Sequence, residues 1–189
     1  MPLHHHREKT LNALAYMAER VPDFGLTLAF KGLFRIDFKH FQKTGRSVTG
    51  LNYEAWDYGP VNRGIYGELR HDSREDDMNE VLEISWENTP GNQRRAVKAK
   101  RSADTKYFTR REIKLLDEAV EYLKKVTAGE ASKESHEAFA GAWEKVWQNG
   151  LGKNEPIPYP LALDELPDEE REQIILLIKE RNEFLTLYA

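Results

Sequence analysis

Apolar residues recur every three or four positions along most of the chain, which predicts a largely helical protein. The clearest case is residues 26–44, where apolar side chains are so frequent that we expect a long, buried helix. Gly45 follows it, and glycine tolerates the left-handed conformation in which helices often end. The predicted helices cover residues 10–20, 26–44, 60–70, 109–127, 132–147 and 168–188.

Helix-start signals support several of these boundaries. Thr109, with Glu112 three positions later, has the pattern of a capping box. Pro60 suits the first turn of a helix, because its missing N–H needs no partner there. Thr49 is expected to cap a further short helix that extends to about Trp56.

One region alternates apolar and polar residues instead, as half-buried strands do. Residues 81–86 and 95–101 carry this pattern, and a Pro-Gly-Asn turn signal at 90–92 lies between them. We therefore predict a two-stranded β-hairpin, closed by a loop of about six to eight residues. The expected fold class is α+β and mostly α: a compact helical domain with a small β-hairpin and a C-terminal amphipathic helix.

The chain is long enough for one domain with an extension. We expect residues 1–9 to be a flexible N-terminus, residues 10–149 to form the domain, and residues 150–189 to hold a Gly/Pro connector and the C-terminal helix. The apolar stripe of that helix can dock on its own domain, on a partner or on a second copy. Docking on the same domain is favoured, because about six exposed apolar side chains would promote aggregation.

Composition argues against several classes of function. The 28 Lys and Arg residues against 32 Asp and Glu residues leave a net charge of −4, which makes nucleic acid an unfavourable partner. The chain has no cysteine, so thiol catalysis and Cys-ligated zinc are excluded. No apolar run approaches the roughly 20 residues of a membrane span, and the N-terminus lacks the apolar stretch of a signal peptide. We expect a cytoplasmic protein with no membrane partner.

The densest group of motifs lies at residues 45–69, in the segment GRSVTGLNYEAWDYGPVNRGIYGEL. A Thr-Gly step, a cluster of aromatic residues and the sequence Tyr-Gly-Pro-Val follow one another there. A preceding helix carries Lys31, and a later Ser-His-Glu group begins at Ser135. This ordered set, which spans roughly residues 10–147, resembles the Panacea domain of the SocA-like antitoxin family.

The residues that match the family's motifs are expected to hold the fold rather than to perform chemistry. They are Asp37, His40, Gly45, Thr49, Gly50, Tyr53, Gly59, Pro60, Val61, Tyr66, His136 and Trp143. The sequence departs from the pattern at Gly32, where a larger apolar residue is usual. The part beyond residue 150 has no counterpart in the family pattern.

The resemblance implies an antitoxin of a toxin–antitoxin system, with a role in phage defence, that neutralises a cognate toxin by direct protein–protein binding. Some such proteins act as adaptors that hand the toxin to a protease, so a protease or chaperone is a second candidate partner. Neither role requires enzyme activity, a cofactor, a metal or catalytic residues in this chain. The alternative is a DNA-binding autoregulator or a phage-associated regulatory protein with the same fold. The oligomeric state stays open.

Several residues admit both a functional and a structural interpretation. Asp37 and His40 are three positions apart on one helix, so they can share a hydrogen bond and His40 can be considered as a base. Packing is favoured, because the sequence offers no nucleophile motif. The three histidines at 4–6 suggest a metal, but adjacent histidines on a terminus cannot hold a closed coordination geometry alone. His136 is expected to pack against Trp143 rather than to bind a metal.

The aromatic residues divide between core and surface. Tyr53 and Tyr66 are expected in the core, between helices. Trp56 and Tyr58 lie beside a Gly-Pro turn and are expected at the surface. Together with Arg63 they form the predicted partner-binding set, since aromatic and arginine side chains dominate interface hot spots.

One basic run keeps the nucleic-acid alternative open. Five Lys and Arg side chains between 94 and 101 can either contact phosphates or line a solvated edge strand. The solvated strand is favoured, because acidic residues between 75 and 80 would cancel much of the positive field.

Overall fold

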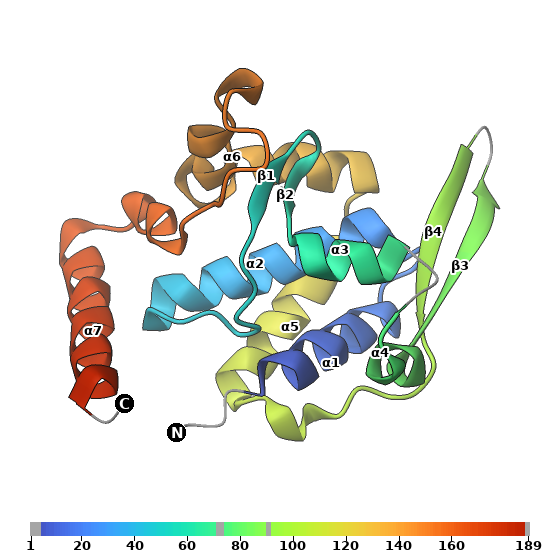
Figure 1. Ribbon diagram of the computed structural model, residues 1–189, viewed down its shortest axis with the longest axis horizontal. Coiled ribbons are helices and arrows are strands. Elements are labelled where there is room, and N and C mark those ends of the chain that lie inside the picture. Colours follow the sequence, from blue (N-terminus) through green and yellow to red (C-terminus); the bar gives the residue numbers. More distant parts are fainter. Residues whose placement is uncertain (1–4, 71–73, 90–91, 188–189) are drawn as a thin grey trace.

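Helix α2 (Leu26–Thr44) runs through the centre of the molecule (Figure 1). The computed structural model describes residues 5–70, 74–89 and 92–187. The other α-helices and strands are α1 (His6–Ala18), β1 (Glu54–Trp56), β2 (Gly59–Val61), α3 (Arg63–Arg70), α4 (Asp76–Val81), β3 (Leu82–Thr89), β4 (Asn92–Ala99), α5 (Arg110–Leu123), α6 (Ala128–Trp147) and α7 (Asp168–Leu187). Short 3-10 helices lie at Thr105–Tyr107, Gln148–Gly150 and Tyr159–Glu165. Helices α1 and α5 cover one side of α2, and β1, β2 and α6 cover the other.

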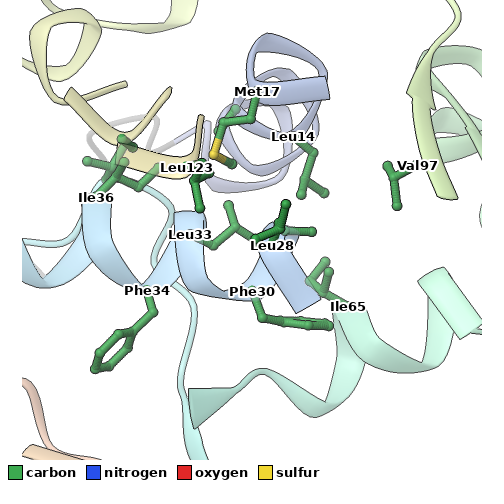
Figure 2. Close-up of a cluster of buried hydrophobic side chains, with 14 of the residues drawn as sticks. Leu14, Met17, Leu28, Phe30, Leu33, Phe34, Ile36, Ile65, Val97 and Leu123 are labelled. Carbon is green, nitrogen blue, oxygen red and sulfur yellow. The ribbon is translucent and has the colours of Figure 1, made fainter. Parts of the chain in front are cut away.

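The hydrophobic core forms on both sides of α2, which is why that helix is apolar around most of its circumference. Leu33 and Ile36 point toward α1 and α5, whereas Phe34 points to the opposite side (Figure 2). All three side chains are almost completely buried. The predicted helix over 26–44 is therefore confirmed, and Gly45 ends it with a left-handed φ of 66°.

Gly32 explains how closely α1 and α2 approach each other. A Cβ atom at this position would lie 2.3 Å from the Sδ atom of Met17 and 3.1 Å from a methyl carbon of Leu123. Those two side chains occupy the space of the larger residue that is usual here in the family pattern. The departure at Gly32 is thus compensated inside the core.

The predicted hairpin is present as β3 and β4, which pair antiparallel from Leu82 opposite Ala99 to Thr89 opposite Asn92. This register leaves only positions 90–91 between the strands, so the expected loop of six to eight residues is wrong. The turn residues Pro90 and Gly91 lie outside the described residues. The body of the molecule holds β4 through a hydrogen bond from the backbone N–H of Val97 to the carbonyl of Phe24, 3.0 Å long.

A second, smaller hairpin was not predicted. Strands β1 and β2 pair antiparallel, with Trp56 opposite Gly59. The short helix expected after Thr49 is therefore wrong, and Pro60 lies in a strand rather than in the first turn of a helix. Helix α3 begins only at Arg63, after Asn62, whose side-chain oxygen accepts a hydrogen bond from the backbone N–H of Ile65 at 2.9 Å.

Capping boxes set the starts of α5 and α6. Thr109 and Glu112 form the predicted box at the start of α5. That helix ends at Leu123 instead of residue 127, because Thr127 forms a second capping box and starts α6. Helix α6 covers the predicted range 132–147 but is interrupted at 138–141, where the backbone leaves helical geometry.

Helices α1 and α7 lie near the two ends of the chain. Helix α1 begins at His6, four positions before the predicted start, and residues 1–4 lie outside the described residues. The C-terminal helix is present as α7, and it contacts the C-terminal end of α2 through Ile174 and Ile178. The described part of the chain is mostly α with two small antiparallel hairpins, which confirms the predicted class. Within the described ranges, no helix is long and apolar enough to cross a membrane.

Candidate functional site

Asp37 fixes the irregular segment that leads from α2 into β1. Its carboxylate accepts hydrogen bonds from the backbone N–H groups of Val48 and Thr49, both at 2.8 Å, and from the hydroxyl of Tyr53 at 2.7 Å. The Thr49 hydroxyl donates to it as well. Asp37 is completely buried, and this burial raises its pKa to about 6, although the four donors act in the opposite direction. Its hydrogen bonds make Asp37 the organising residue of the segment before β1.

Asp37 and His40 have different partners and do not share the hydrogen bond that their spacing would allow. The Nδ1 atom of His40 lies 2.7 Å from the carbonyl oxygen of Arg46, and the hydroxyl of Thr44 lies 3.2 Å from the same nitrogen. Burial lowers the pKa of His40. The ring is therefore satisfied by the end of its own helix, as the packing interpretation expects.

The turn between β1 and β2 is held to the core through its backbone. The Nζ atom of Lys31 donates to the carbonyl oxygen of Tyr58 at 2.5 Å, and the hydroxyl of Ser132 donates to the same oxygen at 2.5 Å. The indole N–H of Trp143 donates to the carbonyl of Trp56 at 3.1 Å. Three side chains from α2 and α6 thus fix two carbonyls, one at the end of β1 and one in the turn itself.

Gly59 is required at this turn by both conformation and space. Its φ is 107°, a region that L-residues rarely adopt. A Cβ atom there would lie 2.3 Å from Nζ of Lys31 and 2.6 Å from the hydroxyl oxygen of Ser135. The glycine of the Tyr-Gly-Pro-Val motif therefore allows the turn to pack closely against Lys31 and α6.

Lys31 is an unusual residue for a protein core. Only 4% of it is exposed, and burial lowers the pKa of its amine to about 7. The cavity beside it, which Glu134 and Phe139 also line, has a volume of about 10 Å³. That is room for about one water molecule, so this site has no space for a substrate.

The side chains of the turn point outward. Tyr58 is 79% exposed. Trp56 is half-buried, with its ring centroid 4.8 Å from that of Tyr66, so it is less of a surface residue than expected. Arg63 is exposed and donates to the carboxylate of Glu54 at 2.7 and 3.0 Å. The same carboxylate accepts the indole N–H of Trp56 at 2.9 Å.

The remaining predicted motif residues pack as structural elements. Tyr53 is buried against α2, where it contacts Phe34 and Phe38, as expected. The rings of His136 and Trp143 stack with centroids 3.8 Å apart, which confirms the expected packing. Pro60 and Val61 are buried in β2 itself, and Gly50 takes a left-handed φ of 71° before β1. Tyr66 is only half-buried and packs against Trp56, so it is less of a core residue than expected. Nowhere in the described ranges do three His, Asp or Glu side chains gather in a way that could hold a metal ion.

The basic run on β4 is largely occupied by other contacts. Arg94 pairs with Asp23 and Glu87, both at 2.8 Å, and Lys98 pairs with Glu87 at 2.6 Å. Lys100 donates to the carbonyl of Asn79 at 2.6 Å. These contacts agree with the solvated-strand interpretation for Lys98 and Lys100, whereas Arg95 is buried and its guanidinium lies over the ring of Trp86.

Sequence reasoning missed three residues of this site. Lys31 belongs to the family pattern, but no role was predicted for it, although a lysine in an apolar helix is a signal of unusual burial. Glu54, which holds Trp56 and Arg63 together, and Ser132, which binds the turn, carry no signal in the sequence. Each acquires its role only from the contacts of the folded chain.

A known family matches the segment that carries this geometry. The family model described as antitoxin SocA-like, Panacea domain, matches residues 30–144. No curated protein and no solved structure gives a significant match. The matched range begins in α2 just before Lys31 and ends in α6 just after Trp143, so it contains the β1–β2 turn and the side chains that fix it. The chain belongs to the SocA-like antitoxin family with the Panacea domain.

Proposed function

We propose that the protein is an antitoxin that neutralises a cognate protein toxin by binding it directly, with the β1–β2 turn at the centre of the contact surface. The observation that carries this proposal is the position of Tyr58, which is 79% exposed while its carbonyl is fixed by two side chains. An exposed aromatic residue on a fixed backbone can contribute binding energy without the entropic cost of ordering the turn.

The neighbouring side chains extend this surface. Glu54 holds both Arg63 and Trp56, so an arginine and an indole near the β1–β2 hairpin are ordered before any partner binds. Tryptophan, tyrosine and arginine are the residue types that dominate binding energy at interfaces. Membership of an antitoxin family supports a toxin as the partner, and a non-catalytic role in the cytoplasm follows from the same proposal.

The test is co-expression with the toxin encoded by the neighbouring gene. Toxin alone should arrest growth, and the wild-type protein should restore growth and co-purify with the toxin. Tyr58→Ala should weaken the complex by about tenfold or more and lose the rescue. The substitution leaves the turn intact, because both hydrogen bonds use the backbone carbonyl of Tyr58.

A matched control tests whether the effect is specific to the turn or follows from the loss of any exposed aromatic residue. Trp86 on β3 is 59% exposed, and Trp86→Ala should leave both rescue and affinity unchanged. Equal affinity of the Tyr58→Ala variant and the wild type would show that the turn is not the contact surface. Toxin abundance during rescue distinguishes the two modes of action: it stays constant if the toxin is occluded, and it falls in a protease-dependent manner if the antitoxin is an adaptor.

A further inference from the structure

Helix α7 leaves most of its apolar side chains in water. It rests on the domain through a narrow strip in which only Ile174 is buried. Six of the nine large hydrophobic residues that are exposed in the described part of the chain belong to this helix. They are Ile175, Leu176, Leu177, Phe184, Leu185 and Leu187. Exposed apolar side chains gathered on one element are typical of a surface that another chain covers.

A groove lies between α7 and the body of the domain. Its volume is about 990 Å³, and its walls come from the ends of α2 and α7 and the starts of α1 and α5. Four arginines line it: Arg46, Arg110, Arg111 and Arg181. Phe184 and Leu185 of α7 form part of its apolar wall.

The positive charge of this groove is not neutralised within the described part of the chain. Its one lining carboxylate, Glu112, is buried and forms a 2.6 Å ion pair with Lys9. Among the described residues, no carboxylate forms an ion pair with any of the four arginines. Burial and the nearby charge of Arg46 lower the pKa of Arg181. The net charge of the protein is −4, so this groove is a local positive site on an acidic protein. An acidic partner would complement its charge.

The other end of α7 supplies acidic groups. Its first turn holds Asp168, Glu169 and Glu170, and of these only Asp168 has an ion-pair partner on the described chain, Arg171 at 2.5 Å. Glu170, Leu177 and Phe184 follow one another at intervals of seven, so they lie on one face of the helix. Leu177 is at the middle of α7, and Phe184 borders the groove.

We propose that two copies of the protein associate through α7 as an antiparallel, two-fold pair centred on Leu177, with the acidic first turn of each α7 seated at the arginine groove of the other copy. A two-fold interface uses the same surface twice. Antiparallel pairing brings the start of one α7 beside the end of the other, which joins Glu169 and Glu170 to the arginines at both ends. It also covers Leu177 and Phe184 in one contact.

Other partners would complement either the charge or the apolar side chains of this surface, but not both. Nucleic acid would pair with the arginines but would leave the leucines of α7 in water. A small anion would fill the groove and would leave the middle of α7 uncovered. A second copy matches both the charge and the apolar face. The inference does not rest on the antitoxin proposal, because the β1–β2 turn takes no part in it.

The first experiment is sedimentation equilibrium of the full chain. The wild type should reach a dimer whose dissociation constant rises with salt, since charge pairs at the edges are screened. Leu177→Glu should raise the dissociation constant by about tenfold or more, because it places two charges at the two-fold axis. Leu151→Glu is the matched control: Leu151 is 87% exposed on another part of the chain, and its substitution should leave the dimer unchanged. Circular dichroism verifies that both variants are folded.

Exchanging the charges of the arginine groove and of the first turn of α7 tests whether the two α7 helices pair antiparallel. Arg110→Glu with Arg111→Glu should weaken the dimer, and so should Glu169→Arg with Glu170→Arg. A mixture of these two double variants should form a heterodimer more strongly than either forms a homodimer. The glutamates introduced at Arg110 and Arg111 lie in the first turn of α5, where negative charge is tolerated, so folding should be preserved.

Three results would overturn the proposal. A wild-type chain that is monomeric at every concentration excludes the dimer. Equal effects of Leu177→Glu and Leu151→Glu remove α7 from the interface. A monomer that binds fluorescein-labelled duplex DNA, and loses it on reversal of Arg110 and Arg111, would assign the groove to phosphate instead. Toxin neutralisation by a strictly monomeric protein would leave the proposed function standing while this inference fails.

Discussion

The amine nitrogen of Lys31 lies 2.5 Å from the carbonyl oxygen of Tyr58. One of the most buried polar groups of the protein therefore holds the backbone of one of its most exposed aromatic residues. Lys31 comes from the central helix α2, and Tyr58 comes from the turn of the β1–β2 hairpin. Changes around Lys31 in the core can therefore reach the proposed binding surface through this contact.

Lys31 should make the stability of the protein depend on pH. Burial lowers the pKa of Lys31 from 10.5 to about 7, so between these values the unfolded chain binds more protons than the folded one. The free energy of unfolding should therefore rise with pH in this window, by up to about 1.4 kcal/mol per pH unit. Lys31→Met should lack this rise. Urea denaturation followed by circular dichroism at several pH values above 7 measures it.

An exposed lysine of the same helix provides the control for this prediction. Lys43 lies in the last turn of α2, and Lys43→Met should keep the wild-type pH dependence. The same slope in the wild type and in Lys31→Met would mean that Lys31 is charged in the folded protein at all these pH values. The buried amine would then need a nearby counter-charge, and Glu134, which lines the same cavity, would be the candidate.

Gly59→Ala should destabilise the protein, whereas Gly67→Ala should not. Alanine at Gly59 must adopt a φ of 107° and push against Lys31 and Ser135, which should cost about 2–3 kcal/mol. Gly67 lies inside α3, and a Cβ atom added there would have no neighbour within 4 Å, so alanine should stabilise by about 0.5–1 kcal/mol. Thermal unfolding of the two variants gives the comparison, and equal melting temperatures would contradict the tight fit of the turn.

Asp37→Asn should be more harmful than Tyr53→Phe. The asparagine keeps the size of the aspartate but turns a donor toward backbone N–H groups and hydroxyls that already donate, which should cost about 2–3 kcal/mol. Tyr53→Phe removes only one of the four donors to Asp37 and should cost about 1 kcal/mol. Denaturant unfolding of both variants ranks the two effects, and the reverse order would show that Asp37 does not organise the segment before β1.

The long helices and the β3–β4 hairpin could be predicted because their signals are local. The helix over Leu26–Thr44 is set by its apolar period and by Gly45, and α5 is set by the capping box of Thr109. The β1–β2 hairpin could not be predicted, since its strands have only three residues each. Its position depends on contacts from distant parts of the chain, above all the bonds that Asp37 makes to the segment before β1.

The candidate site was predictable to the extent that its residues are neighbours in sequence. Trp56, Tyr58 and Arg63 lie within eight positions of one another, so their proximity follows from the chain itself. The geometry that makes them rigid depends on pairs far apart in sequence. Ser132 binds the carbonyl of Tyr58 across 74 positions, and no pattern around Ser132 indicates that contact.

Glu54 should affect toxin binding through the order that it imposes on its neighbours. Its carboxylate accepts hydrogen bonds from both Trp56 and Arg63, so Glu54→Ala would free two side chains that are fixed before binding. A partner would then have to order them, which should weaken the complex by about threefold to tenfold. Isothermal titration calorimetry with purified toxin measures the change, and the fold should remain intact because the pair is at the surface. Glu87→Ala is the matched control, since Glu87 holds Arg94 and Lys98 in the same way on the β3–β4 hairpin. If the two variants bind the toxin equally well, the preorganisation of Trp56 and Arg63 does not contribute to recognition.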